Sequence, residues 1–565
     1  MYKLRVYCYS IFLLIPVLSS QSTLADLIIS NGVIHTLDPN QARVDAIVTR
    51  GDKIIFAGGL DAAKNMAAEN HRFLDLEGAT LTPGFIEAHG HIMSLGMSKL
   101  NLDLSHAKNY DEVVDQVKSA VALAKPGEWI QGRGWHQSKW APQPKNMVKG
   151  FQTHEKLSAV SPNNPVYLVH ASGHAAMANA AAMKIADIHS ETEVKGDGEV
   201  IKDDQLRPTG ILNEKASHLV KQYIPEPDDS VRARALTLAL EEMARHGITS
   251  FQDAGAGKVE IALFKNFLKQ NKLSTRLWVM LNGSDQELLL DWYRKGPEIG
   301  LGENFLSIRA IKLVADGALG TRGAWLLAPY SDRADHVGLP TMSIDYLEKV
   351  SRKAFEKNFQ VGIHAIGDRA NREVLDVFER VFSHKNQGVR FRIEHSQHID
   401  PTDIPRFAQL GVIASIQGVH MSSDRPWAID RLGKKRIEEG AYMWKALSDS
   451  GAMVINGTDV PVEPINPIAS FYALVTRQTL GGMPAGGYEP DQKLNRLQAL
   501  KTYTLNAAYG AFEENIKGSI EAGKLADFTV FDQDILSIPD DQLLDTNVVM
   551  TIVGGKIIYK RARED

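Results

Sequence analysis

The chain has 565 residues, of which 44% are hydrophobic, and a formal net charge of -5. This length exceeds the roughly 250 to 300 residues that one hydrophobic core supports, so we expect a large domain with a smaller satellite or a big insertion. The absence of a basic excess argues against nucleic acid as a partner.

The first 25 residues are typical of a signal peptide. Basic residues precede an apolar stretch at 11–18, and small residues at 23–25 predict a cut after Ala25. A retained anchor is disfavoured because the apolar run is interrupted and shorter than the roughly 20 residues of a spanning helix. We therefore expect export to the periplasm or the exterior, with no membrane association after cleavage.

The single cysteine, Cys8, lies inside this N-terminal segment. The mature chain would then contain no thiol and no disulfide. Catalysis by a cysteine nucleophile and metal binding through thiolates are thereby excluded.

Both ends of the mature chain have sequence patterns typical of β-strands. Short apolar segments separated by turn residues stand at 26–34, 46–49, 53–57, 528–531, 548–553 and 556–559. We expect residues 26–82 and 516–565 to form one small β-sandwich. Residues 83–515 would then form a separate α/β unit.

Within that unit, strand-like segments alternate with helix-length segments. The eight strand candidates are 81–91, 248–253, 276–281, 308–314, 361–364, 389–395, 412–417 and 453–459. Repeated βα units of this number predict an α/β fold, a (β/α)8 TIM barrel, whose catalytic residues come from the C-terminal ends of the strands. A long insertion at 92–229 separates the first two strands.

The first strand ends in His89 and His91. Side chains two residues apart on a strand point the same way, so both imidazoles could bind one metal ion. The pair alone is a weak signal, because isolated histidines more often lie on a surface or make ordinary hydrogen bonds. Other expected strands, however, carry or end in further candidate ligands, namely Lys312, His364, His395 and Asp459.

The segments around these six residues resemble the metal-dependent amidohydrolase superfamily, and within it the YtcJ-like branch, also called the amidohydrolase 3 family. The resemblance rests on residues 89–91, 311–317, 362–368, 393–397 and 457–461. Residues 518–527 also resemble the sequence segment that precedes the superfamily's C-terminal β-domain. The similarity covers nearly all of the mature chain.

The resemblance implies a divalent metal centre. His89, His91 and Asp459 would hold a more buried ion, and His364 and His395 a second one. Zn²⁺ is expected because imidazole and carboxylate ligands suit it. Lys312 would be carboxylated by carbon dioxide and bridge the two Zn²⁺ ions. A site with one metal ion is the alternative.

The implied activity is hydrolysis of carbon–nitrogen bonds in non-peptide amides or N-acyl compounds. A metal-bound hydroxide would attack the carbonyl carbon, with Asp459 as general acid and base. An ester or lactone hydrolase and a non-catalytic relative are the alternatives, and the intact ligand set argues against the second. The expected partner is a small-molecule substrate, and a homo-oligomer is left open.

The insertion at 92–229 is far longer than an ordinary loop and resembles the inserted subdomain of this branch. It would lie over the active-site mouth and influence substrate choice. The predicted substrate-binding residues are Trp135, His174, Asp316, Arg322, Gln417 and His420. Asp368, Gln397 and His398 are expected to hydrogen-bond the histidine ligands. His136 and Gly418 depart from the branch's usual pattern, which leaves the specificity open.

Overall fold

The computed structural model describes residues 26–137, 140–170, 175–194, 198–382 and 388–562. The predicted signal peptide at 1–25 and the predicted substrate-binding residue His174 lie outside the described residues. Among the described residues, no helix is both long enough and apolar enough to span a membrane.

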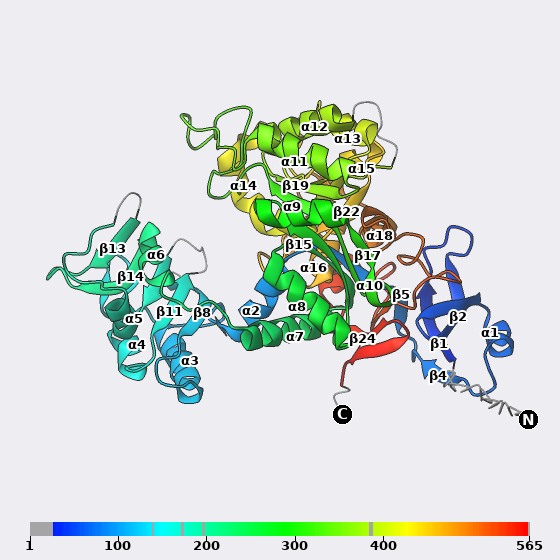
Figure 1. Ribbon diagram of the computed structural model, residues 1–565, viewed down its shortest axis with the longest axis horizontal. Helices are drawn as coiled ribbons and strands as arrows, with labels where there is room; N and C mark the ends of the chain where they lie inside the picture. Colours follow the sequence, from blue (N-terminus) through cyan, green and yellow to red (C-terminus); the bar gives the residue numbers. More distant parts are fainter. Residues whose placement is uncertain (1–25, 138–139, 171–174, 195–197, 383–387, 563–565) are drawn as a thin grey trace, which may run out of the picture.

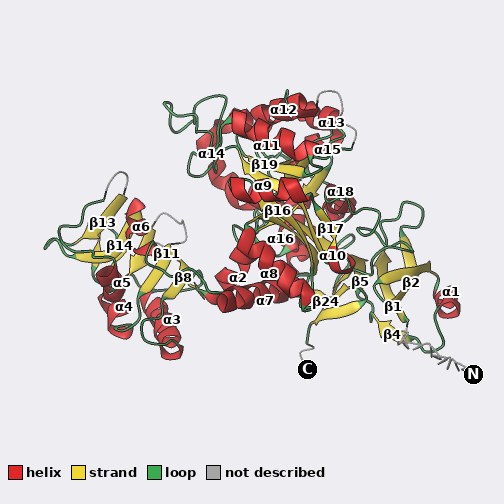
Figure 2. Ribbon diagram, viewed as in Figure 1, coloured by secondary structure: helices red, strands yellow, loops and turns green. Residues whose placement is uncertain are grey.

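Eight parallel strands form the centre of the molecule (Figures 1 and 2). In spatial order they are β6 (Phe85–Gly90), β15 (Ile248–Ala256), β16 (Arg276–Asn282), β18 (Leu306–Val314), β19 (Gln360–Ala365), β20 (Arg392–His395), β21 (Ile413–Ile416) and β22 (Val454–Asn456). The segment after the last strand contacts the first strand: the N–H of Asp459 donates to the carbonyl of His89 at 2.8 Å. The predicted TIM barrel is confirmed.

The barrel strands are buried along almost their whole length, as expected of a parallel sheet covered on both faces. The covering helices include α7 (Asp229–Arg245), α8 (Lys258–Lys269), α9 (Gln286–Lys295), α11 (Ile344–Glu356), α12 (Asp368–Phe382) and α13 (Ile404–Leu410). After β22, the chain continues through α16 (Pro467–Thr476), α17 (Arg496–Thr502) and α18 (Leu505–Gly510). The β18 edge also pairs with the short β17 (Glu298–Gly300), which precedes α10 (Leu301–Asn304).

Strands from both ends of the chain share one eight-stranded sheet. Its members are β1 (Leu27–His35), β2 (Arg43–Arg50), β3 (Lys53–Gly58), β4 (Arg72–Asp75), β5 (Thr80–Pro83), β23 (Phe528–Phe531), β24 (Val548–Val553) and β25 (Lys556–Lys560). The two ends meet where β5 pairs antiparallel with β23, and the helix α1 (Leu60–Met66) follows β3. A division of this sheet into two packed layers stays a prediction.

A buried ion pair connects this terminal sheet to the barrel. Arg276, the first residue of β16, donates from Nε and Nη2 to the carboxylate of Asp527 at 2.7 and 3.0 Å. The N–H of Gly554 donates to the same carboxylate at 2.8 Å. Asp527 therefore connects the barrel with the turn between β24 and β25.

The insertion has a six-stranded sheet of its own, beside the barrel in Figure 1. Its strands, in spatial order, are β13 (Gly198–Lys202), β14 (Pro208–Glu214), β12 (Ala175–Ala178), β11 (Val166–His170), β8 (Ile130–Trp135) and β7 (Leu102–Asp103). Its other elements are α3 (Tyr110–Leu123), β9 (Met147–Val148), β10 (Phe151–Gln152), α4 (Glu155–Val160), α5 (Ala180–Ile185) and α6 (His218–Lys221). The exact domain boundaries stay predictions.

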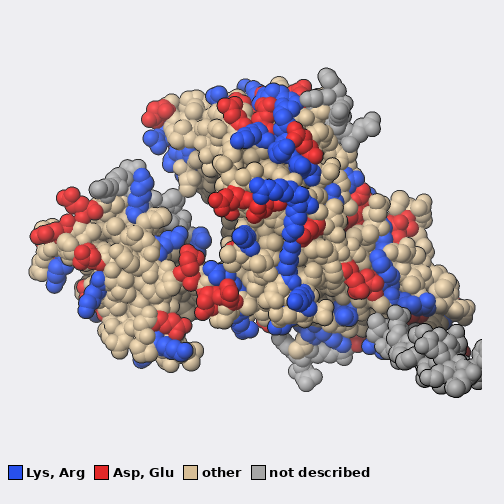
Figure 3. Space-filling model, viewed as in Figure 1, with Lys and Arg blue, Asp and Glu red and all other residues tan. Residues whose placement is uncertain are grey.

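The insertion leaves the barrel through α2 (Ile92–Leu100), which packs closely on α7. A Cβ atom at Gly96 would lie 2.1 Å from the carbonyl oxygen of Ala235, so only glycine permits this approach. Figure 3 shows basic and acidic side chains interspersed over the viewed face of the molecule.

Candidate metal centre

Three of the predicted ligands converge at the C-terminal end of the barrel. His89, His91 and Asp459 each offer one ligand atom, and these atoms lie within 4.8 Å of one another. Nε2 of His91 is 3.2 Å from Oδ1 of Asp459, and Nε2 of His89 is 3.5 Å from the same oxygen. Asp459 follows β22 with a φ of 60°, a conformation uncommon outside glycine. This cluster fits a divalent metal site.

The other three predicted ligands lie beside this cluster. The ring of His395 is 4.9 Å from that of His89 and 4.4 Å from that of His364, between centroids. Lys312 lines the same cavity, which has a volume of about 660 Å³. The structure therefore brings all six predicted residues together at one cavity.

Three of the atoms that could ligate a metal ion make no hydrogen bond in the described structure. His89 Nε2, His364 Nε2 and Asp459 Oδ1 are buried, and none has a hydrogen-bond partner among the described residues. Buried polar atoms in proteins are nearly always partnered, so a bound cation is a direct way to satisfy these three. The residues present fit a metal ion.

The protonation states suit metal binding. Burial lowers the pKa of His89 to about 4 and that of His364 to about 3, with a further lowering by the charge of Lys312. Burial would raise the pKa of Asp459, but the adjacent ring of His91 and the fields of nearby histidines hold it well below its usual range. Neutral imidazoles and an ionised carboxylate are the forms that ligate metals.

Lys312 is also perturbed. Burial lowers the pKa of its ammonium to about 8, while the negative charges of Glu394 and Asp459 act in the opposite direction. A substantial share of Lys312 is therefore a neutral amine slightly above neutral pH. Only that form is nucleophilic.

Glu394 is a site residue that the sequence analysis missed. Its Oε2 accepts a hydrogen bond from Nδ1 of His89 at 2.6 Å, and its Oε1 lies 2.8 Å from Nε of Arg392. Both charged residues are fully buried in β20. Burial would raise the pKa of Glu394, but Arg392 and His89 hold it well below the usual range. Two charges within a short buried strand were the signal that could have revealed this pair.

Gln417 and His420 follow β21 and contact the same centre. Oε1 of Gln417 accepts a hydrogen bond from Nδ1 of His395 at 2.7 Å, which turns Nε2 of that ring toward the cavity. The ring of His420 lies parallel to that of His395, with centroids 6.1 Å apart, and it lines the cavity. Gln417 thus orients a predicted ligand, and His420 faces the space where a substrate would bind.

Asp316 lies beside the centre, with its Oδ1 3.4 Å from Nε2 of His364, whereas Arg322 is engaged elsewhere. The carboxylate of Asp316 is fully buried and accepts hydrogen bonds from the backbone N–H groups of Trp325, Ile366 and Gly367. Arg322 forms an ion pair with Asp332 at 2.8 Å, and it is not among the residues that line the cavity. Their predicted substrate contacts stay predictions.

Trp135 lies in the core of the insertion. Its indole is fully buried and donates to the carbonyl of Leu168 at 2.9 Å. Among the described residues, none of those that line the cavity comes from the insertion, and Figure 1 places this lobe beside the barrel. The lobe is attached through α2, which begins directly after the cavity residue His91, and a cover over the mouth stays a prediction.

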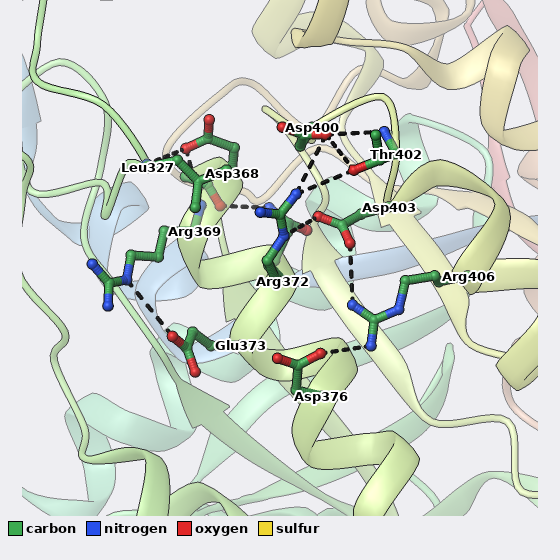
Figure 4. Close-up of polar contacts among 12 residues, drawn as sticks. Leu327, Asp368, Arg369, Arg372, Glu373, Asp376, Asp400, Thr402, Asp403 and Arg406 are labelled. Atoms are coloured by element: carbon green, nitrogen blue, oxygen red, sulfur yellow. Dashed lines mark hydrogen bonds and ion pairs between the residues drawn. The ribbon is translucent and has the colours of Figure 1, made fainter.

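Asp368 belongs to a polar network outside the centre (Figure 4), and His398 lies beside it. Asp368 accepts from the N–H of Leu327 at 2.8 Å and lies 3.4 Å from Nε2 of His398. One turn along α12, Arg372 donates to Asp403 at 2.7 Å. In the described structure these contacts join α12 to the segment before α13 and leave the metal-centre histidines untouched.

Comparison with known proteins agrees with this site. Residues 72–559 match the family model described as "Amidohydrolase family". This match spans most of the chain, and the chain therefore belongs to the amidohydrolase family.

Three relatives extend across nearly the whole chain. "Protein LONG AFTER FAR-RED 3" of Arabidopsis thaliana is 31% identical, over 95% of this chain and 92% of the relative. "Putative amidohydrolase YtcJ" of Bacillus subtilis is 29% identical, over 94% and 99%. "N-substituted formamide deformylase" of Arthrobacter pascens is 27% identical, over 95% and 98%. The predicted resemblance to the YtcJ-like branch is confirmed.

Among solved structures, an uncharacterized metal-dependent hydrolase from Pyrococcus horikoshii superimposes with a TM-score of 0.76. It is 28% identical, and the match covers 92% of this chain and 99% of that chain. Family, fold and ligand cluster together define a metal-binding hydrolase.

Proposed function

We propose that the protein hydrolyses carbon–nitrogen bonds in non-peptide amides or N-acyl compounds. The observation that carries the proposal is the convergence on one cavity of three buried atoms that lack a hydrogen-bond partner in the described structure, His89 Nε2, His364 Nε2 and Asp459 Oδ1. The relative named as a formamide deformylase supports a carbon–nitrogen bond as the bond that breaks.

The proposed centre holds two Zn²⁺ ions. His89, His91 and Asp459 bind one ion, and His364 and His395 bind the other. Lys312 would supply a ligand to both ions once its neutral Nζ had formed a bond to the carbon of carbon dioxide and released one proton. The resulting negative carbamate offsets part of the charge of the ions, whereas an ammonium would add to it. A site with one metal ion is the alternative.

When bound, a divalent ion supplies a Lewis acid that polarises a carbonyl oxygen and makes hydroxide available at neutral pH. The chain's own residues then move the proton and hold the substrate. Asp459, ionised at neutral pH, accepts a proton at a carboxylate oxygen and passes it to the leaving nitrogen. His420 presents an unpartnered Nε2 to the cavity of the described structure and binds the substrate's polar group.

A substrate panel tests this function. Zn²⁺-loaded protein is assayed with N-formyl amines, N-acetyl amines, N-acyl amino acids and cyclic amides, each beside the matching ester or lactone. We expect hydrolysis of at least one amide class, its loss after chelation and its return with added metal. Turnover of esters and lactones alone would favour the alternative hydrolase, and inactivity of metal-loaded protein on every class would refute hydrolysis.

Export is part of the same proposal. We propose that the chain is cut after Ala25 and that the mature protein acts in the periplasm or outside the cell. N-terminal sequencing of protein recovered from an exporting host tests this, and a mature chain beginning near Asp26 is the expected result. Intact Met1 on the recovered protein would contradict it.

A further inference from the structure

One wall of the cavity is formed by α14 (Gly418–Gly440). Its residues His420, Asp424 and Trp427 all line the cavity. Their spacing of four and then three residues puts them on one face of the helix. Because His420 lies beside the ring of His395, Asp424 stands one helical turn, about 5.4 Å, further along the axis. This face therefore leads from the metal centre into the outer part of the cavity.

A second carboxylate, that of Glu463, lines the same part of the cavity. It accepts a hydrogen bond from Ser423, the neighbour of Asp424 on α14. Burial raises the pKa of Asp424 to about 6, with an additional contribution from the charge of Glu463. The two carboxylates are therefore close enough to interact, and Asp424 is largely ionised above neutral pH.

These carboxylates have no cation to neutralise them. Among the described residues, neither forms an ion pair with a lysine or arginine, and Gln397 only donates to Asp424 at 3.4 Å. The adjacent Arg425 points elsewhere and pairs with Glu489 at 2.6 Å. Lys312, at the metal centre, is the one lysine in the described lining, and no arginine is present there.

A second observation also indicates a ligand. His420 is only 9% exposed, and its Nε2 has no hydrogen-bond partner among the described residues. The charge of His420 would lower the pKa values of both Asp424 and Asp459. His420 therefore lies between the metal centre and the outer part of the cavity. An unpartnered nitrogen at this position is suited to a polar atom of a bound molecule.

Apolar and aromatic side chains also line the cavity. Leu319, Met342 and Val462 line it, and the indole of Trp427 lies against the backbone of Gly320. An aromatic face beside two carboxylates is favourable for an organic cation, through both cation–π attraction and charge-assisted hydrogen bonds. A carboxylate in the same place would meet like charges. The guanidinium of Arg431 lies 5.9 Å from the centroid of the Trp427 ring, but it is already paired with Asp332.

We propose that the outer part of the cavity binds a protonated amine between Asp424, Glu463 and Trp427. Resting on the proposed hydrolysis, we further infer that the substrate is an amide or N-acyl compound whose far end carries an ammonium group. The chain thus selects mono-acylated diamines or similar cations over N-acyl amino acids.

A binding measurement tests the subsite without turnover. Metal-loaded protein is titrated by calorimetry at pH 7.5 with hexylammonium chloride and, separately, with the neutral hexanol. We expect hexylammonium to bind at least about tenfold more tightly. Asp424→Asn and Glu463→Gln should each remove most of this preference, while Asp61→Asn, an exposed carboxylate on α1, should keep it. Equal binding of both ligands, or a preference that survives both variants, would overturn the proposal.

A turnover measurement separates this inference from the proposed function. The substrates are mono-N-formyl hexamethylenediamine, the neutral N-formylheptylamine and the N-formyl ω-amino acid of equal length. We expect kcat/KM to fall in that order, by about tenfold at the first step, and Asp424→Asn to reduce the first step selectively. Hexylammonium binding without hydrolysis of any amide would sustain the subsite and refute the hydrolase. Hydrolysis of all three at equal rates would sustain the hydrolase and refute the subsite.

Discussion

Nδ1 of His89 donates to Oε2 of Glu394 at 2.6 Å, although 305 positions separate the two residues in the sequence. The carboxylate fixes the tautomer and the orientation of the ring, so that Nε2 faces Asp459. Arg392 in turn holds Glu394 from the opposite side. A metal ligand on the first barrel strand is thus oriented by the sixth.

Glu394→Gln should weaken both the metal site and the fold. The variant leaves Arg392 as an uncompensated buried charge, which should lower the free energy of unfolding by roughly 3 to 5 kcal/mol. Loss of the carboxylate on His89 should reduce metal affinity by about 10- to 100-fold. Chelator competition and urea unfolding measure the two effects. Glu373→Gln on α12, which removes only a pairing with Arg369 near the surface, is the matched control. A folded Glu394→Gln protein with unchanged metal affinity would contradict this role.

Asp459→Asn should abolish turnover while sparing the fold. The amide is isosteric but cannot accept the proton in transit, so we expect kcat to fall by about 10²- to 10⁴-fold. Steady-state kinetics on variant protein with its metal content measured distinguishes loss of proton transfer from loss of the ion. Full activity at equal metal content would remove Asp459 from the mechanism.

Lys312→Ala should lower the number of bound metal ions from two to one. The alanine cannot form the carbamate that we propose as the bridge, and the second ion would keep only His364 and His395. Elemental analysis of purified wild type and variant gives the metal-to-protein ratio. ¹³C NMR of wild-type protein equilibrated with labelled bicarbonate should show a carbamate signal that the variant lacks. Two tightly held ions in Lys312→Ala would refute the bridge.

The metal-free protein should lose stability in acid through its site histidines. The pKa of His364 falls from 6.5 in the unfolded chain to about 3 in the folded protein. Between these values the unfolded chain binds more protons, so the contribution is complete above pH 6.5 and is lost as the pH falls toward 3.

The contribution of His364 is isolated by comparison with His364→Asn, because the raised pKa values of buried groups that do not contact it, such as Asp253, then cancel. Between pH 7 and pH 5, the free energy of unfolding of wild type relative to this variant should fall by about 2 kcal/mol. Guanidinium unfolding of both metal-free proteins measures the difference. His189→Asn at an exposed position should show no such trend, and a flat difference for His364→Asn would contradict the assigned shift.

Asp527→Asn should destabilise the protein without changing its chemistry. Arg276 would lose a bidentate, almost fully buried partner, which should lower the free energy of unfolding by roughly 3 to 5 kcal/mol. The metal content of the folded fraction should remain that of wild type, because Asp527 lies between barrel and terminal sheet. Asp541→Asn at an exposed position serves as the comparison. Equal unfolding midpoints for the two variants would show that the pair does not join the two units.

The positions of the barrel strands could be predicted because each is a short apolar run between helix-length segments. The residues at which the strands end were harder to predict from the sequence. The eighth strand was expected at 453–459, but β22 stops at Asn456, and Asp459 stands in a turn with positive φ. His395 likewise has a φ of 77°. Such conformations are imposed by the surrounding site and leave no periodic signal in the sequence.

The ligand set could be predicted from motifs, whereas the partners of the ligands could not. The contact from Gln417 to His395 and that from Glu394 to His89 depend on which strands become neighbours in the closed barrel. The internal packing of the insertion could not be predicted either, because Trp135, expected to bind substrate, is buried in the insertion's own core.

The junction of β5 with β23 has a consequence for synthesis. Across this junction the N–H of Phe85 donates to Oγ1 of Thr529, 444 positions later. At the roughly 5 to 20 residues per second of translation, the N-terminal strands wait about 20 to 90 s for the partners that complete their sheet. Through that interval their open edge is a template for wrong pairing. The chain therefore needs protection on its way out of the ribosome, because β5 is made early but is among the last strands to gain its second neighbour.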